Sequence, residues 1–198
     1  MPLVAPGPIE SPRLRLRLVT EADLPSLLEV NSNAEVTALL PYATWSSLSD
    51  GEAWYERMSG IQATGLALQF VVVNKSTGTA IGTCLLFRFE EASARVELGY
   101  ALGRAFWGQG FMREALTALL NRAFGSMGLR RIEAEVDPRN IASAALLTRL
   151  GFAREGLLRK RWVTKGRAED VEMYGLLRGE LRDEAGRVWS DSSIERAS

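Results

Sequence analysis

The feature that most constrains this fold is a strand pattern that runs into a glycine-rich loop and then into a helical pattern. The strand is expected at Ala94–Leu102, the loop spans residues 103–110 with three glycines, and the helix is expected at Phe111–Met127. Glycines let a ligand approach the backbone closely, and a helix N-terminus presents free N–H groups at the positive end of its dipole. The segment therefore predicts an anion site suited to a phosphate, although a simple tight turn has the same pattern. It matches neither a Walker loop nor a full dinucleotide fingerprint.

The rest of the chain predicts one mixed α/β domain. The domain is expected at residues 13–180, between an N-terminal extension at 1–12 and a frayed C-terminal tail at 181–198. Further strands are expected at Leu14–Leu18, Leu66–Asn74, Ala80–Phe89, Arg130–Val136, Phe152–Val163 and Val171–Leu177. Helices are expected after a capping box at Thr20 and Asp23, at Ala34–Leu40, from a second capping box at Ser49 and Glu52 to Gln62, and from Asn140 to Gly151.

Composition excludes several classes of protein. The 198 residues carry 24 basic and 24 acidic side chains, so no net positive charge favours nucleic acid. The absence of histidine removes the Ser-His-Asp triad and most zinc sites, and no metal is expected. Cys84, the only cysteine, lies in an apolar run and is expected to be a buried core thiol. With no signal segment and no apolar stretch long enough for a membrane span, a cytoplasmic protein without a membrane partner is expected.

Three motifs in order resemble the GNAT acetyltransferases, and most of all the ribosomal-protein N-terminal acetyltransferase (RimJ/RimL-like) branch. The first resembles the acetyl-CoA pyrophosphate loop, the second a CoA-contacting helix with the strand after it, and the third the closing strands. They are Trp107-Gly108-Gln109-Gly110-Phe111 with Glu114-Ala115; Asn140-x-x-Ser143 with Leu150-Gly151-Phe152; and Gly156-x-x-Arg159 with Asp170-x-x-x-Tyr174.

The resemblance implies the GNAT fold, a twisted, mostly antiparallel sheet of about seven strands with flanking helices. Its fourth and fifth strands splay apart, and the pantetheine of acetyl-CoA pairs with the exposed strand edge. The implied cofactor-binding residues are Tyr100, Ala101, Leu102, Trp107, Gly108, Gln109, Gly110, Phe111, Met112, Arg113, Asn140, Ser143 and Arg149. Arg104 is a further candidate phosphate partner, and Asn140 is also a natural helix N-cap. Met112 replaces a small residue of the family motif and is expected to crowd the loop.

The implied reaction is acetyl transfer from acetyl-CoA to a primary amine, which attacks only when neutral. Without histidine, the base is a carboxylate acting through water, or water itself. Glu97 is the candidate base, because it shares a strand face with small residues that leave room for a substrate. Glu133 and Glu135 are less favoured as the base, because they are expected to be exposed charges. Ser143 is the candidate acid for the leaving thiolate, with Tyr174 an outside candidate. The tyrosine that many relatives carry seven residues after the Asn position is Leu147 here.

The leading hypothesis is therefore a direct N-acetyltransferase without a covalent enzyme intermediate. A non-catalytic acyl-CoA-binding module is the alternative, which Leu147 keeps open, and a nucleotide-phosphate-binding domain is a third. The acceptor is a protein N-terminus or a small-molecule amine, and a homodimer is one option for the assembly. Specificity is expected from residues 34–62 and the last two strands, with Trp45, Trp54, Tyr55 and Trp162 as candidate lining residues.

Overall fold

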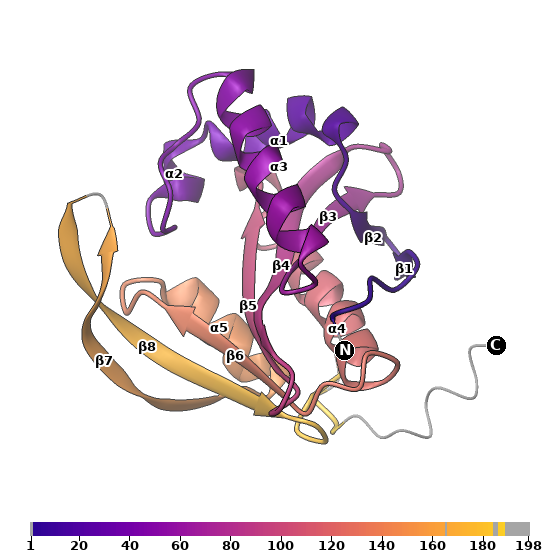
Figure 1. Cartoon of the computed structure of the whole chain (residues 1–198), viewed down its shortest axis with the longest axis vertical. Coiled ribbons are helices and arrows are strands. Elements are labelled where there is room, and N and C mark those ends of the chain that lie inside the picture. The colour runs from indigo at the N-terminus through magenta and orange to yellow at the C-terminus, as the bar shows by residue number, and fades with distance from the viewer. Residues whose placement is uncertain (1, 165, 184–185, 189–198) are drawn as a thin grey trace.

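The computed structural model describes residues 2–164, 166–183 and 186–188. The described strands form one sheet in the order β1-β2-β3-β4-β5-β6-β8-β7 (Figure 1). All neighbouring strands are antiparallel except β5 and β6. The strands are β1 (Ile9–Glu10), β2 (Leu14–Leu18), β3 (Leu68–Asn74), β4 (Ala80–Glu90), β5 (Arg95–Leu102), β6 (Arg131–Val136), β7 (Ala153–Thr164) and β8 (Arg167–Leu177).

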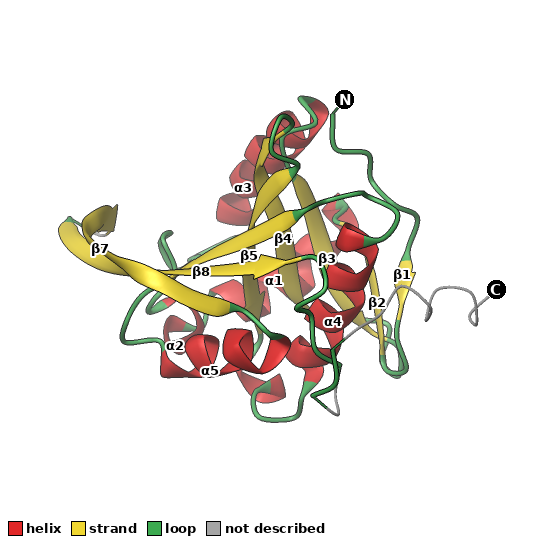
Figure 2. Cartoon of the chain, turned by 90° about the horizontal axis from the view of Figure 1, so that it is seen from below, coloured by secondary structure: helices red, strands yellow, loops and turns green. Residues whose placement is uncertain are grey.

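Helices cover both faces of the sheet (Figure 2). Successive strand residues point to opposite faces, and both faces carry apolar side chains that the helices bury. On one face α4 and α5 pack on the larger core, with fully buried Leu116, Leu119 and Ile132 among its members. On the other face α1 and α3 cover a smaller cluster around Val71 and Trp45. The helices are α1 (Leu24–Asn31), α2 (Ala34–Thr37), α3 (Leu48–Ala63), α4 (Phe111–Phe124) and α5 (Ile141–Leu150), with short 3₁₀ turns at Glu21–Asp23 and Arg104–Phe106.

The parallel pair β5 and β6 separates after a short contact. Within the described chain, β5 pairs with β6 only from Arg95 to Glu97, opposite Arg131 to Glu133. Residues 98–102 continue to pair with β4 on the other side, so their edge toward β6 stays open. The two strands diverge in Figure 1, as expected for the fourth and fifth of the strands that the sequence predicts. The sheet therefore divides into two parts joined at three residue pairs.

Several predicted boundaries need correction. Helix α3 is capped by Ser47 with Asp50 rather than by Ser49 with Glu52, because the hydroxyl and carboxylate of the earlier pair meet the backbone N–H groups. Helix α4 ends at Phe124, three residues before the expected Met127, where Gly125 follows. Strand β8 begins four residues before the expected Val171.

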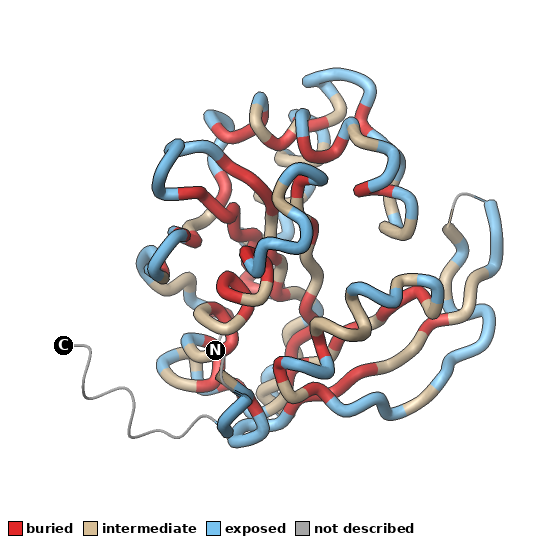
Figure 3. Tube along the Cα trace, turned by 180° about the vertical axis from the view of Figure 1, so that it is seen from behind, coloured by how far each residue is buried: buried red, intermediate tan, exposed pale blue. Residues whose placement is uncertain are grey.

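The two segments expected outside the domain also contact it. The expected N-terminal extension contains β1, an additional strand that pairs with β2, and buries Leu3 and Ile9 in the larger core. Leu181, the first residue of the expected tail, is also fully buried. Residues 184–185 and 189–198 of that tail lie outside the described residues. Buried residues are concentrated in the central strands and α4, whereas β7 is largely exposed (Figure 3). Among the described helices, none has the length and apolar character to cross a bilayer.

Candidate active site

The glycine loop forms a tight entry into α4. Gly108 and Gly110 have φ angles of 72° and 79°, a left-handed conformation that glycine adopts without steric cost. Gly110 is the N-cap of α4, and because it has no side chain the first-turn amides receive no side-chain cap. In the described part of the chain, no atom beyond the two neighbouring residues lies within 4 Å of the position that a Cβ atom at Gly108 would occupy. The loop therefore presents open backbone and uncapped N–H groups, which fit a phosphate.

Side chains of the loop bind its own backbone. The indole Nε1 of Trp107 donates to the carbonyl oxygen of Leu102 at 2.7 Å, at the end of β5. The amide of Gln109 donates to the carbonyl oxygen of Ala105 at 2.7 Å. Arg104 stacks on Trp107, with its guanidinium carbon 4.9 Å from the ring centroid, and also pairs with Glu35 at 2.9 Å. These contacts fix the shape of the loop and direct Arg104 toward α2.

The expectation that Met112 crowds the loop is wrong. Met112 is 7% exposed and packs in the larger core, where Cys84 Sγ lies 3.9 Å from its Sδ atom. The helix turns this side chain away from the loop because position 112 belongs to the buried face of α4. Cys84 is fully buried, which confirms the expected core thiol, and burial raises its pKa.

The other candidate phosphate partners differ in position. The Nη2 atom of Arg113 donates to the carbonyl oxygen of Asp183 at 3.0 Å, so its guanidinium contacts the C-terminal segment. Arg149 lies in the last turn of α5 and is exposed. Of these two candidates, Arg149 has the side chain turned toward solvent.

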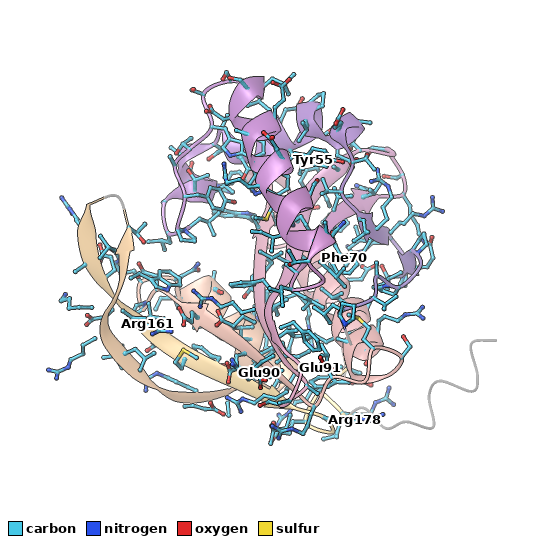
Figure 4. All side chains as sticks on the ribbon, in the orientation of Figure 1. Tyr55, Phe70, Glu90, Glu91, Arg161 and Arg178 are labelled. Carbon is cyan, nitrogen blue, oxygen red and sulfur yellow. The ribbon has the colours of Figure 1, made fainter. Side chains whose placement is uncertain are left out.

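A cleft of about 410 Å³ opens where β5 and β6 separate. Its lining comes from both sides of the divided sheet, from the start of α5 and from the segment after α2. Figure 4 labels Arg161 on its β7 side. The lining residues include Leu39, Leu40, Pro41, Phe87, Arg88, Glu97, Gly99, Tyr100, Glu135, Asp137, Asn140, Ser143, Arg161 and Trp162.

Glu97 is buried at the point where the two strands separate. Its residue is 6% exposed, and it is the last residue of β5 that pairs with β6. Arg88 reaches it from β4, where a register shift and a φ of 52° at Arg88 redirect the side chain. Burial raises the pKa of Glu97, while the hydrogen bonds and charge of Arg88 act in the opposite direction. The result is a carboxyl group with a raised pKa at the floor of the cleft.

The expectation that Glu133 and Glu135 are exposed charges is wrong. The side chain of Glu135 is 5% exposed and lies 3.8 Å from Arg88, so Arg88 lies between two carboxylates. Trp162 Nε1 also donates to Glu135, from a strand segment displaced by a second register shift in β7. Glu133, at 13% exposure, instead pairs with Arg95 and Arg131. The alternation of residues in β6 shows that Glu133 and Glu135 share one face of the sheet. It does not show that residues of β7 cover Glu135 on that face.

Asn140 and Ser143 lie together at the N-terminus of α5. The Asn140 side chain accepts a hydrogen bond from the Ser143 N–H at 3.1 Å, so Asn140 caps the helix. The Ser143 hydroxyl lies 2.6 Å from the Tyr100 hydroxyl of β5. Tyr100 is only partly exposed, and its burial raises its pKa. This hydroxyl pair connects the two sides of the cleft.

The remaining aromatic and acid candidates pack in or against the two core clusters. Leu147 is fully buried, and Tyr174 is 4% exposed with its hydroxyl donating to Glu172 at 2.9 Å. Trp45 and Trp54 pack against each other with centroids 5.6 Å apart in the smaller core cluster. Tyr55 packs on the same cluster, so of the four candidate aromatic residues only Trp162 is among the described lining of the cleft.

Comparison with known proteins gives the family. The acetyltransferase (GNAT) domain profile matches residues 13–153. The uncharacterized N-acetyltransferase p20 of Bacillus licheniformis is 38% identical over 168 residues, which cover 85% of this chain and 94% of that protein. The [ribosomal protein uS5]-alanine N-acetyltransferase of Escherichia coli K12 is 38% identical over 79 residues, 40% of this chain and 41% of that one. The crystal structure of a ribosomal-protein-S5-alanine acetyltransferase from Vibrio fischeri superposes with a TM-score of 0.76 at 25% identity, covering 89% and 99% of the two chains.

The divided sheet, the uncapped helix start and these matches define the class of the protein: the chain belongs to the GNAT acetyltransferases. It is an N-acetyltransferase, of the family that uses acetyl-CoA to acetylate amines. Its relatives and structural neighbours include ribosomal-protein acetyltransferases, as the sequence motifs indicate.

Proposed function

We propose that the protein transfers an acetyl group directly from acetyl-CoA to a primary amine, with no covalent enzyme intermediate. The observation that carries the proposal is the buried carboxyl group of Glu97 at the floor of the cleft between β5 and β6. A thioester in this opening would have the start of α5 on one side and the residues after α2 on the other. The amine would then attack from the side that Glu97 faces.

The donor binds along the open edge of β5 and the glycine loop. The pantetheine pairs with the edge at Tyr100–Leu102, and its path ends where Trp107 occupies the Leu102 carbonyl oxygen. The amides of residues 109–113 bind the pyrophosphate at the helix N-terminus. Asn140 contacts the pantetheine from α5 while it caps that helix, and Arg149 is the remaining exposed phosphate candidate.

Glu97 acts as the base through a water molecule. An α-amine has a pKa near 8 and a lysine amine one near 10.4, so roughly a tenth of the former is neutral at pH 7, and far less of the latter. A carboxylate with a raised pKa accepts a proton better than an ordinary glutamate, because its pKa is closer to the pH at which the enzyme works. Glu135, which also contacts Arg88, is the next carboxylate in line.

Ser143 donates a proton to the thiolate of the leaving CoA. Its hydroxyl lies 2.6 Å from that of Tyr100, whose raised pKa keeps it protonated over the working range. As Ser143 protonates the thiolate, Tyr100 passes its hydroxyl proton to the Ser143 oxygen, and Tyr100 regains a proton from solvent, which receives the one that the amine loses. Leu147, in the position where many relatives carry a tyrosine, lies in the core and takes no part.

The acceptor is a protein N-terminus or a small-molecule amine. The relatives named for alanine acetylation of a ribosomal protein support the first option. The acceptor end of the cleft combines the apolar residues Leu39, Leu40 and Pro41 with charged Arg88 and Arg161. This mixture suits an amine that carries further groups, as a peptide does.

The test is transfer from radiolabelled acetyl-CoA to a panel of amines. The panel contains peptides with N-terminal alanine or serine, a peptide with one lysine and a blocked N-terminus, a polyamine and an arylamine. We expect label on at least one acceptor, with Glu97→Gln as the control of matched shape. Binding of CoA by calorimetry without transfer to any acceptor would contradict the proposal and favour the non-catalytic acyl-CoA-binding module.

A further inference from the structure

We propose that Arg13 is a positioning residue that holds the glycine loop in its phosphate-binding shape. The proposal rests on the proposed function, because it concerns the site that binds the donor. Arg13 lies just before β2, about a hundred positions from the loop along the chain. Its role is inferred from three sets of contacts.

The first contact fixes Arg13 to the helix that follows the loop. Its Nε atom donates to Glu114 Oε2 at 2.6 Å, and its backbone N–H donates to Glu114 Oε1 at 2.7 Å. The Ser11 hydroxyl donates to the same oxygen at 2.7 Å. Glu114 is 5% exposed in the first turn of α4, so these bonds join the N-terminal segment to the helix start.

The second contact reaches the loop itself. Arg13 Nη1 donates to the carbonyl oxygen of Gln109 at 3.0 Å. The peptide between Gln109 and Gly110 is trans and planar, so its N–H points opposite to that carbonyl group. Because Arg13 holds the Gln109 carbonyl oxygen toward itself, the Gly110 N–H points away from Arg13. That N–H belongs to the set of amides that the proposed function assigns to the pyrophosphate.

The third contact places the positive charge beside the loop. The guanidinium carbon lies over the Phe111 ring, 4.2 Å from its centroid, in a cation–π contact. The Nη2 atom lies 3.5 Å from the Cβ position of a side chain at Gly110. The Arg13 side chain is 45% exposed, so its charge adds to the positive potential of the helix N-terminus from the carbonyl side of the peptide, without contacting the phosphate itself.

The test compares donors that differ only in their phosphates. Arg13→Met keeps an apolar side chain against Phe111 but removes the positive charge and the N–H donors of the guanidinium. Arg13→Lys keeps the charge but not the guanidinium geometry. Arg15→Met is the matched control, because Arg15 lies two positions further on and pairs with Glu10, at 54% exposure. Each variant is assayed by calorimetry with CoA and dephospho-CoA, and by kinetics with acetyl-CoA and S-acetylpantetheine.

We expect Arg13→Met to weaken CoA and dephospho-CoA by the same factor, at least tenfold, because both carry the pyrophosphate. KM for acetyl-CoA should rise while kcat changes less than twofold, and S-acetylpantetheine, which lacks the pyrophosphate, should lose nothing. Arg13→Lys should restore part of the affinity, and Arg15→Met should behave as wild type. An equal loss with S-acetylpantetheine, or unchanged CoA affinity, would overturn the proposal.

Calorimetry also separates the two proposals. A wild-type protein that binds CoA but acetylates no amine contradicts the proposed function, while the effect of Arg13 on CoA affinity still decides the present inference. If Arg13→Met does not fold, as a thermal melt would reveal, Arg13→Lys carries the test. That variant should weaken CoA and leave S-acetylpantetheine unaffected, and an affinity for CoA equal to wild type would overturn the inference.

Discussion

Arg88 donates from Nη1 to both carboxylate oxygens of Glu97, at 2.9 Å each. The same arginine lies 3.8 Å from Glu135, and more than half of its side chain is exposed. A positive group therefore lies beside Glu97 in the lining of the cleft. This arrangement lets Arg88 adjust the basicity of Glu97 from the open side of the cleft.

Replacing Glu97 with glutamine keeps the shape but removes the basicity. We expect kcat/KM for an amine of high pKa to fall roughly 10²- to 10⁴-fold at pH 7, the usual contribution of a general base. The loss should shrink as the pH approaches the pKa of the amine, because neutral amine becomes plentiful. Initial rates across pH measure this, and CoA affinity is the control that should hardly change. Activity within threefold of wild type would remove Glu97 from the mechanism and leave water, Glu135 or Glu133 as the base.

Replacing Arg88 with methionine should move the acidic limb of the pH–rate profile to higher pH. Arg88 lowers the pKa of Glu97 against the effect of burial, so its removal raises that pKa further. Because a base works only when deprotonated, activity should then be lost over a wider range below the new pKa. Arg95→Met is the matched control, since Arg95 lies on the same sheet but pairs with Glu133 at 2.5 Å. A limb that stays in place, or moves to lower pH, would contradict this role of Arg88.

Gly110→Asp should abolish most acetyl-CoA binding, because it places a negative charge where the pyrophosphate binds. Gly110→Asn adds nearly the same side chain without the charge and tolerates the φ of 79° equally well, so the pair isolates electrostatics from backbone strain. We expect a much larger rise in KM for acetyl-CoA with aspartate than with asparagine. Equal KM values for the two variants would place the phosphates elsewhere.

CoA and acetyl-CoA should stabilise the folded protein by linkage. The expected gain is about 2.7 kcal/mol at a hundredfold excess over Kd, measured from the shift of thermal melts. Dephospho-CoA should stabilise less at the same concentration if an arginine such as Arg149 binds the ribose phosphate. ATP is the comparison ligand: protection by ATP but not by CoA would favour the nucleotide-binding alternative.

Asp23→Asn should destabilise the protein at neutral pH by about 1–2 kcal/mol. Burial alone would raise the pKa of Asp23, but hydrogen bonds from Arg17 and Thr20 outweigh it and lower the pKa below 3.8. A lowered folded-state pKa gives stability that is present above the unfolded pKa and is lost as pH falls through the folded one. The difference between wild type and variant, from urea melts, should therefore disappear in acid. Asp50→Asn is the control, with a similar cap but no arginine partner among the described residues, and should cost less.

The sequence predicts most of the elements because their signals are local. The alternation at Leu14–Leu18, the turn at residues 76–78 and the glycine after α5 each depend on a few adjacent residues, and the structure contains all three elements. The sequence predicts the capping box of α3 two residues late, because Ser49 and Glu52 have the same spacing as Ser47 and Asp50. Two candidates with one pattern cannot be separated without the backbone.

The contacts of the candidate site depend on distant residues. The burial of Glu135 results from Trp162 and Arg161, which a register shift in β7 brings onto it. Alternation along β6 carries no information about that shift. The bond from Arg13 to Gln109 joins positions 96 residues apart and leaves no spacing signal. Asp and Glu side chains commonly form ion pairs with arginine, so such contacts are expected in general. Arginine is too abundant in this sequence to show which arginine pairs with which carboxylate.

The three residue pairs between β5 and β6 also have a mechanical consequence. They join two plates of sheet, one carrying β1–β5 and the other β6–β8, and Glu97 lies at the end of that seam. Any rotation of one plate on the other would have its axis near the seam, so displacement would grow toward the mouth of the cleft. Glu97 would then stay nearly still while Leu40 and Val163, which also line the cleft, moved apart. Such a layout could admit acceptors of different bulk with little disturbance of the reacting centre.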